Sequence, residues 1–451
     1  MSLAYICISL DQTGFFEYLA LIVARRAGTS GMKLFFYLYL LAGFITIFTS
    51  NDIVILTLTP IIIYMAKYTK INPVPYLLAQ FFAANIWSTF LYIENPTNII
   101  VAQAYNLSFL GFFLWMAIPT VVGGMTAFLI LWLYFRKQIP KTLTPLNSHS
   151  RLALRDRPGA IYITVVLITC LVLLSITVEF AWLFALICAI ACFLRDVGHD
   201  ILLHKRGPKE QQNIIEPCCI DEVLRNNHLQ ENIGQDILQP NSGPKEQHII
   251  VKPDCIDEIV INNHAQEHIH SRYFGKVHCV VTRMPWKIIP FVVGMFIIIG
   301  ALFESGWIEL FANGLSYLMP NAYVSILSMC SISALSANLF NNQPMTILFT
   351  EILLNLNTVN PSIIPFVPYD AAFGAMFAII MGSNYGACFT FIGALAGIMW
   401  RNIATEKNVP ISFRQFAKLG FVVMPFVILA ACTVLALEII AFPGFIPILS
   451  P

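Results

Sequence analysis

Long apolar runs separated by short polar stretches dominate the chain. A helix needs about 17–25 apolar residues to cross a bilayer, and shorter runs suit half-spans. The runs that meet this pattern are 15–24, 32–48, 53–68, 73–104, 110–135, 160–180, 181–193, 288–307, 317–340, 345–356, 363–382, 385–400 and 416–442. The pattern predicts an all-α polytopic membrane protein with about 10–12 helical segments, several of them interrupted.

Composition supports this class. Of the 451 residues, 57% are hydrophobic and 11% are charged, whereas a soluble domain is about one quarter charged. The net charge of +1 gives no reason to expect nucleic acid as a partner. The 11 cysteines are scattered, so no disulfide framework is expected. No zinc-protease, nucleophile-elbow or phosphate-loop motif occurs, so we expect a transporter without a cofactor rather than an enzyme.

Two polar, basic stretches interrupt the apolar pattern and divide the chain. Residues 1–196 form a first membrane half, 197–285 a linker and 286–451 a second membrane half. Six Lys and Arg lie in Arg136–Arg157 and eleven in Arg195–Lys287, but none lies between Lys287 and Arg401. Because basic residues near span ends favour the cytoplasmic side, the basic loops are predicted to be cytoplasmic.

The linker contains a tandem repeat of 36 residues. Residues 207–231 match residues 243–267, and Cys219 and His228 recur as Cys255 and His264. Thiols and imidazoles could bind a soft or borderline metal ion. A duplicated flexible linker that binds no metal explains the same polar composition, and we favour that interpretation.

Four groups of polar residues, here called islands, lie inside apolar runs. They are TSNDIVILTLTP (49–60), ENPTNII (94–100), SANLFNNQPMT (336–346) and GSNYGACFTFIG (382–393). Asn51 precedes Asn95 by 44 residues, and Asn341 precedes Asn384 by 43. Matched interruptions in two halves are typical of a transporter built from repeats, with the binding site at the interruptions.

Elementary physics explains why the islands mark a path for solute. Irregular backbone survives in a membrane only where it is buried in protein or lines a cavity. Pro96 and Pro344 are predicted to break helices, and Gly382 and Gly386 to allow close backbone approach at a break. The side chains predicted to line the path are Ser50, Asn51, Asp52, Asn95, Thr97, Asn98, Asn341, Asn342, Gln343, Ser383, Asn384 and Thr390. They are mostly neutral donors and acceptors, which suit a small polar solute or a cation.

Two acids lie within islands, and an acid inside a membrane indicates function by default. Asp52 and Glu94 are the candidates for carrying a coupling proton, because burial favours the protonated form of a carboxylic acid. Asp52 could equally stabilise the start of the helix that follows it.

The islands resemble the arsenite permease family, the ArsB-type arsenical pump membrane proteins of the superfamily that includes citrate and dicarboxylate carriers. The matching stretches are LDQTGFFEYLALIVARRAG (10–28), SNDIVILTLTPI (50–61), NPTNIIVA (95–102), LYFRKQIP (133–140), NNQPMTIL (341–348), GALAGIMW (393–400) and ISFRQFAKLG (411–420). The likeness covers most of the chain apart from the linker.

The resemblance implies a plasma-membrane or bacterial inner-membrane protein that exports arsenite or antimonite as a neutral hydroxide in exchange for protons. It implies two inverted repeats, each with a re-entrant hairpin and a broken helix, in a homodimer that moves by an elevator mechanism. Some bacterial relatives use a soluble ATPase as a partner. The hairpin tips would be 50–52 and 341–343, and the broken helices would include 95–98 and 383–390.

This sequence departs from the family in several places, including a stretch at 83–85 without the acid often found there and the unusual repeat-bearing linker. Family members commonly begin about two spans before their LDQTGFF-like stretch, so a truncated or reduced first half is expected here. The fourth island lacks the acid and the lysine found in many bacterial relatives. The alternatives are a carrier of carboxylate, silicic acid or sodium-coupled solute, or a truncated membrane protein that does not transport and whose linker binds a metal or a partner.

Overall fold

The protein is described by a computed structural model of residues 2–143, 154–176, 180–205, 275–284, 286, 288–356 and 367–445. All regular elements in these residues are helical, which confirms the predicted all-α class. The helices of the first half are α1 (Ser2–Gln12), α2 (Phe15–Ala27), α3 (Gly31–Phe48), α4 (Asn51–Thr69), α5 (Val74–Trp87), η1 (Tyr92–Glu94), α6 (Pro96–Ala104), α7 (Phe109–Phe135), α8 (Arg157–Ile176) and α9 (Ala181–Lys205). Those that follow are α13 (Lys276–Arg283), α14 (Ile288–Glu304), α15 (Trp307–Ser316), α16 (Ala322–Phe340), α17 (Asn342–Asn355), α18 (Tyr369–Gly386), η4 (Phe391–Gly393), α19 (Leu395–Glu406), α20 (Phe413–Ala441) and η5 (Pro443–Phe445).

Several of these helices are suited to a bilayer. Among the described residues, six helices are long and apolar enough to cross a membrane: α3, α7, α8, α9, α16 and α20. Two bent pairs, α1 with α2 and α14 with α15, raise the number to eight if each pair is one span. The chain is therefore a polytopic membrane protein. The helices outnumber the 10–12 predicted segments because some predicted runs, such as 73–104, form two helices separated by a break.

The chain forms two compact units. The first contains Met1–Ala191 and Pro285–Pro451, so both membrane halves belong to it. The second contains Cys192–Met284, where the carboxylate of Asp200 accepts hydrogen bonds from the backbone N–H groups of Lys276 (2.8 Å) and Val277 (3.0 Å). The tandem repeat, with Cys219, His228, Cys255 and His264, lies outside the described residues.

Each half of the first unit contains a tight helical hairpin at an island. The first hairpin, α3–α4, turns at Thr49 and Ser50, and the second, α16–α17, turns at Asn341 alone. Ser50 caps α4 by accepting from the N–H of Ile53 at 3.3 Å. Asn341 adopts a φ of 73° and a ψ of 153°, a strained backbone conformation that residues other than Gly rarely adopt, and this single residue separates α16 from α17.

Each half also contains a broken helix, and the two breaks have the same layout. In the first, α5 ends at Trp87, four residues follow, and η1, the single residue Asn95 and α6 come next. In the second, α18 ends at Gly386, four residues follow, and η4, the single residue Ala394 and α19 come next. This identical spacing is what duplicated halves would produce. That one half is inverted relative to the other stays a prediction.

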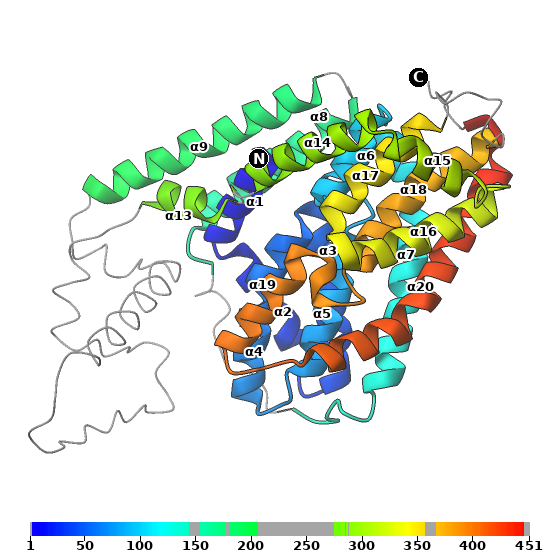
Figure 1. Cartoon of the computed structure of the whole chain (residues 1–451). Helices are drawn as coiled ribbons and strands as arrows, with labels where there is room; N and C mark the ends of the chain where they lie inside the picture. Colours follow the sequence, from blue (N-terminus) through cyan, green and yellow to red (C-terminus); the bar gives the residue numbers. More distant parts are fainter. Residues whose placement is uncertain are drawn as a thin grey trace, which may run out of the picture. The chain divides into compact units, whose positions relative to one another are not determined.

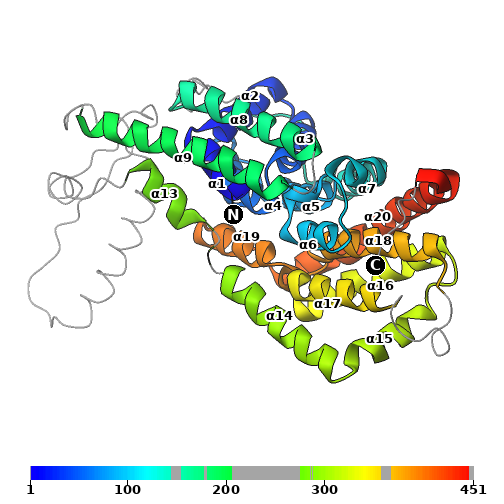
Figure 2. The ribbon, with the colours of Figure 1, turned by 90° about the horizontal axis from the view of Figure 1, so that it is seen from above.

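The hairpins and broken helices of the two halves contact one another as well as their own half. Within each half, the hairpin packs against the first segment of its own broken helix, α3 and α4 on α5, and α16 and α17 on α18. Across the halves, α17 packs on α6 and α4 packs on α19. Figure 2 shows α17 beside α6, with α18 next to both. Figure 1 shows α16, α18 and α20 as neighbouring helices. The four islands are thereby gathered into one region.

The prediction that Gly382 marks a break is wrong. Gly382 lies inside α18, four residues before its end, and faces α16. A Cβ atom there would lie 2.5 Å from the Cβ of Ser333 and 2.7 Å from the carbonyl oxygen of Cys330. The glycine therefore allows two helices to touch, as small residues do in membrane proteins. Gly386 is the last residue of α18 and also meets α16 closely.

Candidate functional site

The side chain of Asn384 joins the two broken helices. It projects from the last turn of α18, is fully buried, and its Oδ1 accepts from Ser88 Oγ (2.7 Å) and Asn95 Nδ2 (2.8 Å). Its Nδ2 donates to Asn98 Oδ1 and to the carbonyl of Ile380, both at 2.8 Å. An amide has two donor hydrogens and an oxygen with two acceptor positions, so every hydrogen-bonding position of Asn384 is used.

Asn98 and Asn95 complete this junction from the first broken helix. Asn98 Nδ2 donates to the carbonyls of Ser88 (2.6 Å) and Leu91 (3.2 Å), which closes the irregular loop between α5 and α6. Asn95 caps α6, because its Oδ1 accepts from the N–H of Thr97 at 3.2 Å. Pro96 is the first residue of α6, where no intrahelical hydrogen bond is lost by lacking an N–H. Backbone groups freed by the break are thus satisfied by asparagines.

The first hairpin reaches its own broken helix through Asn51. This buried side chain donates to Asn85 Oδ1 at 3.2 Å and accepts from the N–H of Asp52 at 2.9 Å. Asp52 lies in the first turn of α4 and is partly exposed. Its carboxylate lies near the positive end of the helix dipole, but the residue that caps α4 is Ser50, so the expectation that Asp52 caps this helix is wrong.

The second hairpin reaches its own broken helix through two asparagines. Asn338 donates to the carbonyl of Gly386 at 3.0 Å and accepts from Thr390 Oγ1 at 2.6 Å. Asn341 donates to the carbonyl of Ile392 at 3.3 Å. Pro344 lies in the first turn of α17, so it starts this helix rather than interrupting one. The two hairpins therefore make similar contacts with different residues.

Four buried side-chain oxygens of the islands make no hydrogen bond to the residues that the structure describes: Glu94 Oε2, Gln343 Oε1, Ser383 Oγ and the Tyr385 hydroxyl. Glu94 is fully buried, and only its Oε1 accepts a bond, from the N–H of Leu91 at 2.8 Å. Buried polar atoms without partners are rare and costly, so each calls for an explanation.

The predicted residues thus divide into two kinds. Asn51, Asn95, Asn98 and Asn384 make hydrogen bonds that hold the breaks in shape, while Glu94, Gln343 and Ser383 retain unused hydrogen-bonding capacity. Asn342 is buried beside Gln343 in the first turn of α17, and its carbonyl accepts from Thr346 Oγ1 at 2.8 Å.

Several residues of this region were not predicted. Asn85, Ser88 and Asn338 belong to the network described above, and Gln80 links three elements. Gln80 Oε1 accepts from Thr59 Oγ1 (3.2 Å) and Trp400 Nε1 (3.3 Å), which ties α4 and α19 to α5. One signal could have identified Asn85. It lies two residues before the end of α5, as Asn384 does before the end of α18.

The electrostatics of the site comes mainly from backbone. Helices α4, α6 and α17 begin within islands and α19 begins two residues after the fourth, so the positive ends of four helices lie at or next to the islands. None of the predicted site residues is a cation, and two of them, Asp52 and Glu94, are acids. In the described part of the chain, no three His, Cys, Asp or Glu side chains are grouped as metal ligands. Carboxamides and hydroxyls therefore provide the chemistry.

Comparison with known proteins agrees with this architecture. The sequence matches the citrate transporter family over residues 1–200 and 276–373. It is 25% identical to an arsenical pump membrane protein of Escherichia coli strain K12, over 96% of this chain and 84% of the relative. A protein of the same description from Yersinia enterocolitica is 24% identical over the same shares. An uncharacterized transporter of Mycobacterium tuberculosis is 23% identical over 92% of this chain and 79% of its own.

These relatives confirm the resemblance that the islands suggested. They extend along nearly the whole chain, and both broken helices of the structure lie within the aligned lengths. The chain is a membrane transporter and belongs to the citrate transporter family.

Proposed function

We propose that this chain exports arsenite or antimonite, as the neutral trihydroxide, in exchange for protons. Its similarity to arsenical pump membrane proteins supports this substrate class. A neutral trihydroxide both donates and accepts hydrogen bonds, as carboxamide and hydroxyl groups do. A site with no lysine or arginine suits an uncharged solute better than an anion.

The observation that carries the proposal is a set of buried side-chain oxygens without hydrogen-bond partners, next to the hydrogen bonds that join the two broken helices. Asn384 and its partners hold the two broken helices together, and this arrangement leaves Gln343 Oε1 and Ser383 Oγ buried without partners. A preformed polar site in a membrane costs energy when empty, so it persists where a solute uses it. Gln343 and Ser383 are the residues that we assign to solute contact.

Glu94 is the residue that we assign to proton coupling. It is fully buried, uses one carboxyl oxygen, and lies in the 3-10 turn of the first break, directly before Asn95 and α6. Protonation of Oε2 would turn an acceptor without a partner into a donor and would change what the break can bind. Asp52, at the tip of the first hairpin, is the second candidate for proton coupling.

Alternating access would follow from movement of the hairpins and broken helices together. The contacts of α4 with α19 and of α17 with α6 link both halves into one cluster, as an elevator-type movement requires. We propose that this cluster carries the site across a plasma membrane or a bacterial inner membrane, with the basic loops in the cytoplasm.

The first experiment measures arsenite accumulation in arsenite-sensitive cells that express the chain. Native protein is expected to lower accumulation, and the Asn341→Ala, Asn342→Ala double variant is expected to lose this effect at equal membrane abundance. A matched control is Asn355→Ala, at the end of α17, where the side chain donates to the carbonyl of Glu351 in the same helix. Accumulation equal to that of empty cells, with normal membrane insertion, would contradict arsenite export.

A carboxylate carrier is the second candidate, favoured by the name of the matching family and by the four helix ends. Helix N-termini can bind carboxylate groups without cationic side chains. Uptake of radiolabelled citrate and succinate into vesicles containing the purified protein would decide between the candidates. Saturable uptake of a carboxylate, without arsenite efflux from cells, would favour this second function.

A further inference from the structure

A basic pocket lies between the end of α7 and the start of α20, where the lining residues Phe413 and Phe421 pack on Phe391 and Phe389 of the fourth island. Its volume is about 800 Å³. The residues that line it are Tyr134, Ser412, Phe413, Arg414, Gln415, Ala417, Lys418 and Phe421. None of them belongs to the candidate transport site, so the pocket needs its own explanation.

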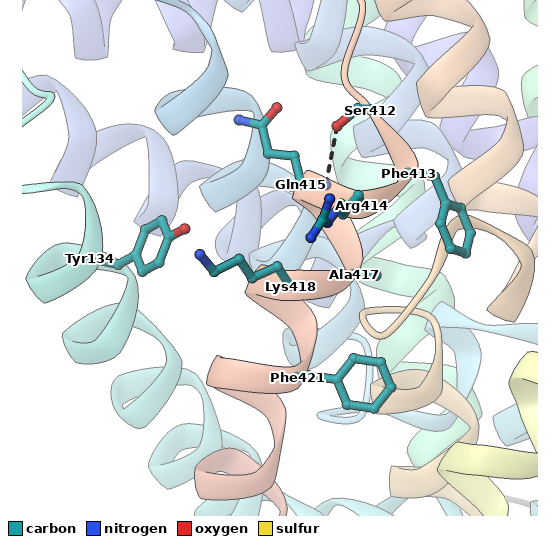
Figure 3. Close-up of a pocket in the computed structure, with 8 residues that line it drawn as sticks. All are labelled: Tyr134, Ser412, Phe413, Arg414, Gln415, Ala417, Lys418 and Phe421. Carbon is teal, nitrogen blue, oxygen red and sulfur yellow. Dashed lines mark hydrogen bonds between the residues drawn. The ribbon is translucent and has the colours of Figure 1, made fainter.

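The two cations of this pocket project from successive turns of α20. Arg414 and Lys418 are four residues apart, so they lie on the same face of the helix, and both are exposed. Figure 3 shows the Lys418 ammonium and the Tyr134 hydroxyl pointing toward one another across the pocket. Ser412 is fixed at the mouth, where its hydroxyl accepts from the N–H of Gln415 at 3.1 Å. The polar side chains of the pocket are therefore two cations, the phenol of Tyr134, the carboxamide of Gln415 and the hydroxyl of Ser412.

No acid on either helix offsets these charges near the pocket. The chain contains no Asp or Glu between Glu94 and Asp156, and none between Glu406 and Glu438. Two further exposed cations, Arg136 and Lys137, lie two and three residues after Tyr134. The pocket consequently attracts an anion.

The surface next to the pocket is apolar. From Leu110 to Leu133, α7 exposes large hydrophobic residues at nearly every turn. On α20, the exposed fractions of Phe421 and Phe426 are 56% and 57%. Both helices are candidate membrane spans, so these faces suit contact with lipid chains. A tyrosine and basic residues at the end of such a face are typical of the headgroup level of a bilayer.

We propose that this pocket binds the phosphate headgroup of an anionic phospholipid, whose acyl chains lie along α7 and α20. Arg414 and Lys418 bind the phosphate, Tyr134 donates a hydrogen bond to it, and Phe413 and Phe421 contact the glycerol and upper chains. The charge complementarity, together with the apolar faces that continue from the pocket, selects a bilayer lipid rather than a soluble anion. The assignment does not depend on which solute the transporter carries.

The test uses the purified full chain in detergent and native mass spectrometry. Phosphatidylglycerol and phosphatidylcholine with the same acyl chains are titrated, and the affinity of the first bound lipid is measured for each. Each basic residue near an anionic headgroup contributes about 1 kcal/mol, so the Arg414→Gln, Lys418→Gln variant is expected to lose roughly 10- to 30-fold of the preference for phosphatidylglycerol. Tyr134→Phe is expected to lose a smaller part of it.

A matched control removes two positive charges elsewhere. Arg26 and Lys33 are exposed and lie outside the pocket, so Arg26→Gln, Lys33→Gln is expected to keep the preference. Equal binding of the two lipids by native protein would overturn the proposal, and so would an unchanged preference in the Arg414→Gln, Lys418→Gln variant. Competition with inorganic phosphate at millimolar concentration tests whether the pocket binds a lipid headgroup or a soluble anion. Displacement of the bound lipid by phosphate alone would assign the pocket to a soluble anion and overturn the lipid assignment.

Discussion

The side chain of Asn384 donates a hydrogen bond to Oδ1 of Asn98 at 2.8 Å, although 286 positions separate the two residues in the chain. The bond connects the broken helix of one half with that of the other. Both side chains are fully buried, so neither can exchange this partner for water. An asparagine at each break thus holds together the region where solute is proposed to bind.

Replacing Asn384 is expected to destabilise the protein. Asn384→Ala removes the hydrogen bonds that Asn95 and Asn98 make to the Asn384 side chain, whereas the Ser88 hydroxyl can still donate to the carbonyl of Asn85. Side-chain hydrogen bonds in membrane proteins contribute about 0.6 kcal/mol on average, and unsatisfied buried groups cost more. The free energy of unfolding is therefore expected to fall by roughly 1–3 kcal/mol. Thermal unfolding of the purified protein would measure it as a lower Tm. A Tm equal to that of Asn355→Ala would contradict the role given to Asn384.

Gly382 is expected to tolerate no side chain. In Gly382→Ala the new Cβ would lie 2.5 Å from Ser333 Cβ and 2.7 Å from a backbone oxygen, so α16 and α18 must move apart. Overpacking of this kind costs about 1–3 kcal/mol. Gly294→Ala on α14 is the matched control, because nothing lies within 4 Å of its Cβ position. Thermal unfolding compares the two variants, and equal Tm values would show that the helices are not in close contact.

The indole of Trp87 fills a space made by two glycines, one on α3 and one on α7. A Cβ atom on Gly43 would lie 2.8 Å from this ring, and one on Gly124 would lie 2.7 Å from it. Gly124→Ala is therefore expected to lower the Tm, and Trp87→Phe is expected to recover part of the loss because it removes the crowded ring atoms. Additive effects of the two substitutions would contradict this contact, since residues that touch couple energetically.

Glu94 and Asp52 are expected to differ in their effect on transport. Glu94→Gln keeps an oxygen that can accept from the N–H of Leu91 but removes the proton-carrying group. Efflux driven by an imposed proton gradient is expected to fall at least tenfold, with the Tm nearly unchanged. The measurement is solute movement in vesicles with and without the gradient. Glu304→Gln, exposed on α14, is the control and should behave as native protein. Full gradient-driven transport by Glu94→Gln would transfer the coupling role to Asp52.

The apolar runs alone were sufficient to predict the class and most helices. Membrane helices satisfy their hydrogen bonds within the segment, so hydropathy along the chain defines them with little help from tertiary contacts. Proline changes local backbone geometry, so the sequence also predicted a helix break at Pro96, where α6 begins. The turn at Asn341 was implied only by the resemblance to the family.

Tertiary structure decided which polar residues meet. Asn384 contacts the first broken helix, whereas Asn338 takes the contacts with the second, and no local pattern distinguishes these two asparagines. Gly382 lies within a helix because what it meets is α16, a contact between segments about 50 residues apart. The pocket between α7 and α20 combines residues nearly 300 positions apart. Such contacts depend on how the helices pack against one another, which the local sequence does not encode.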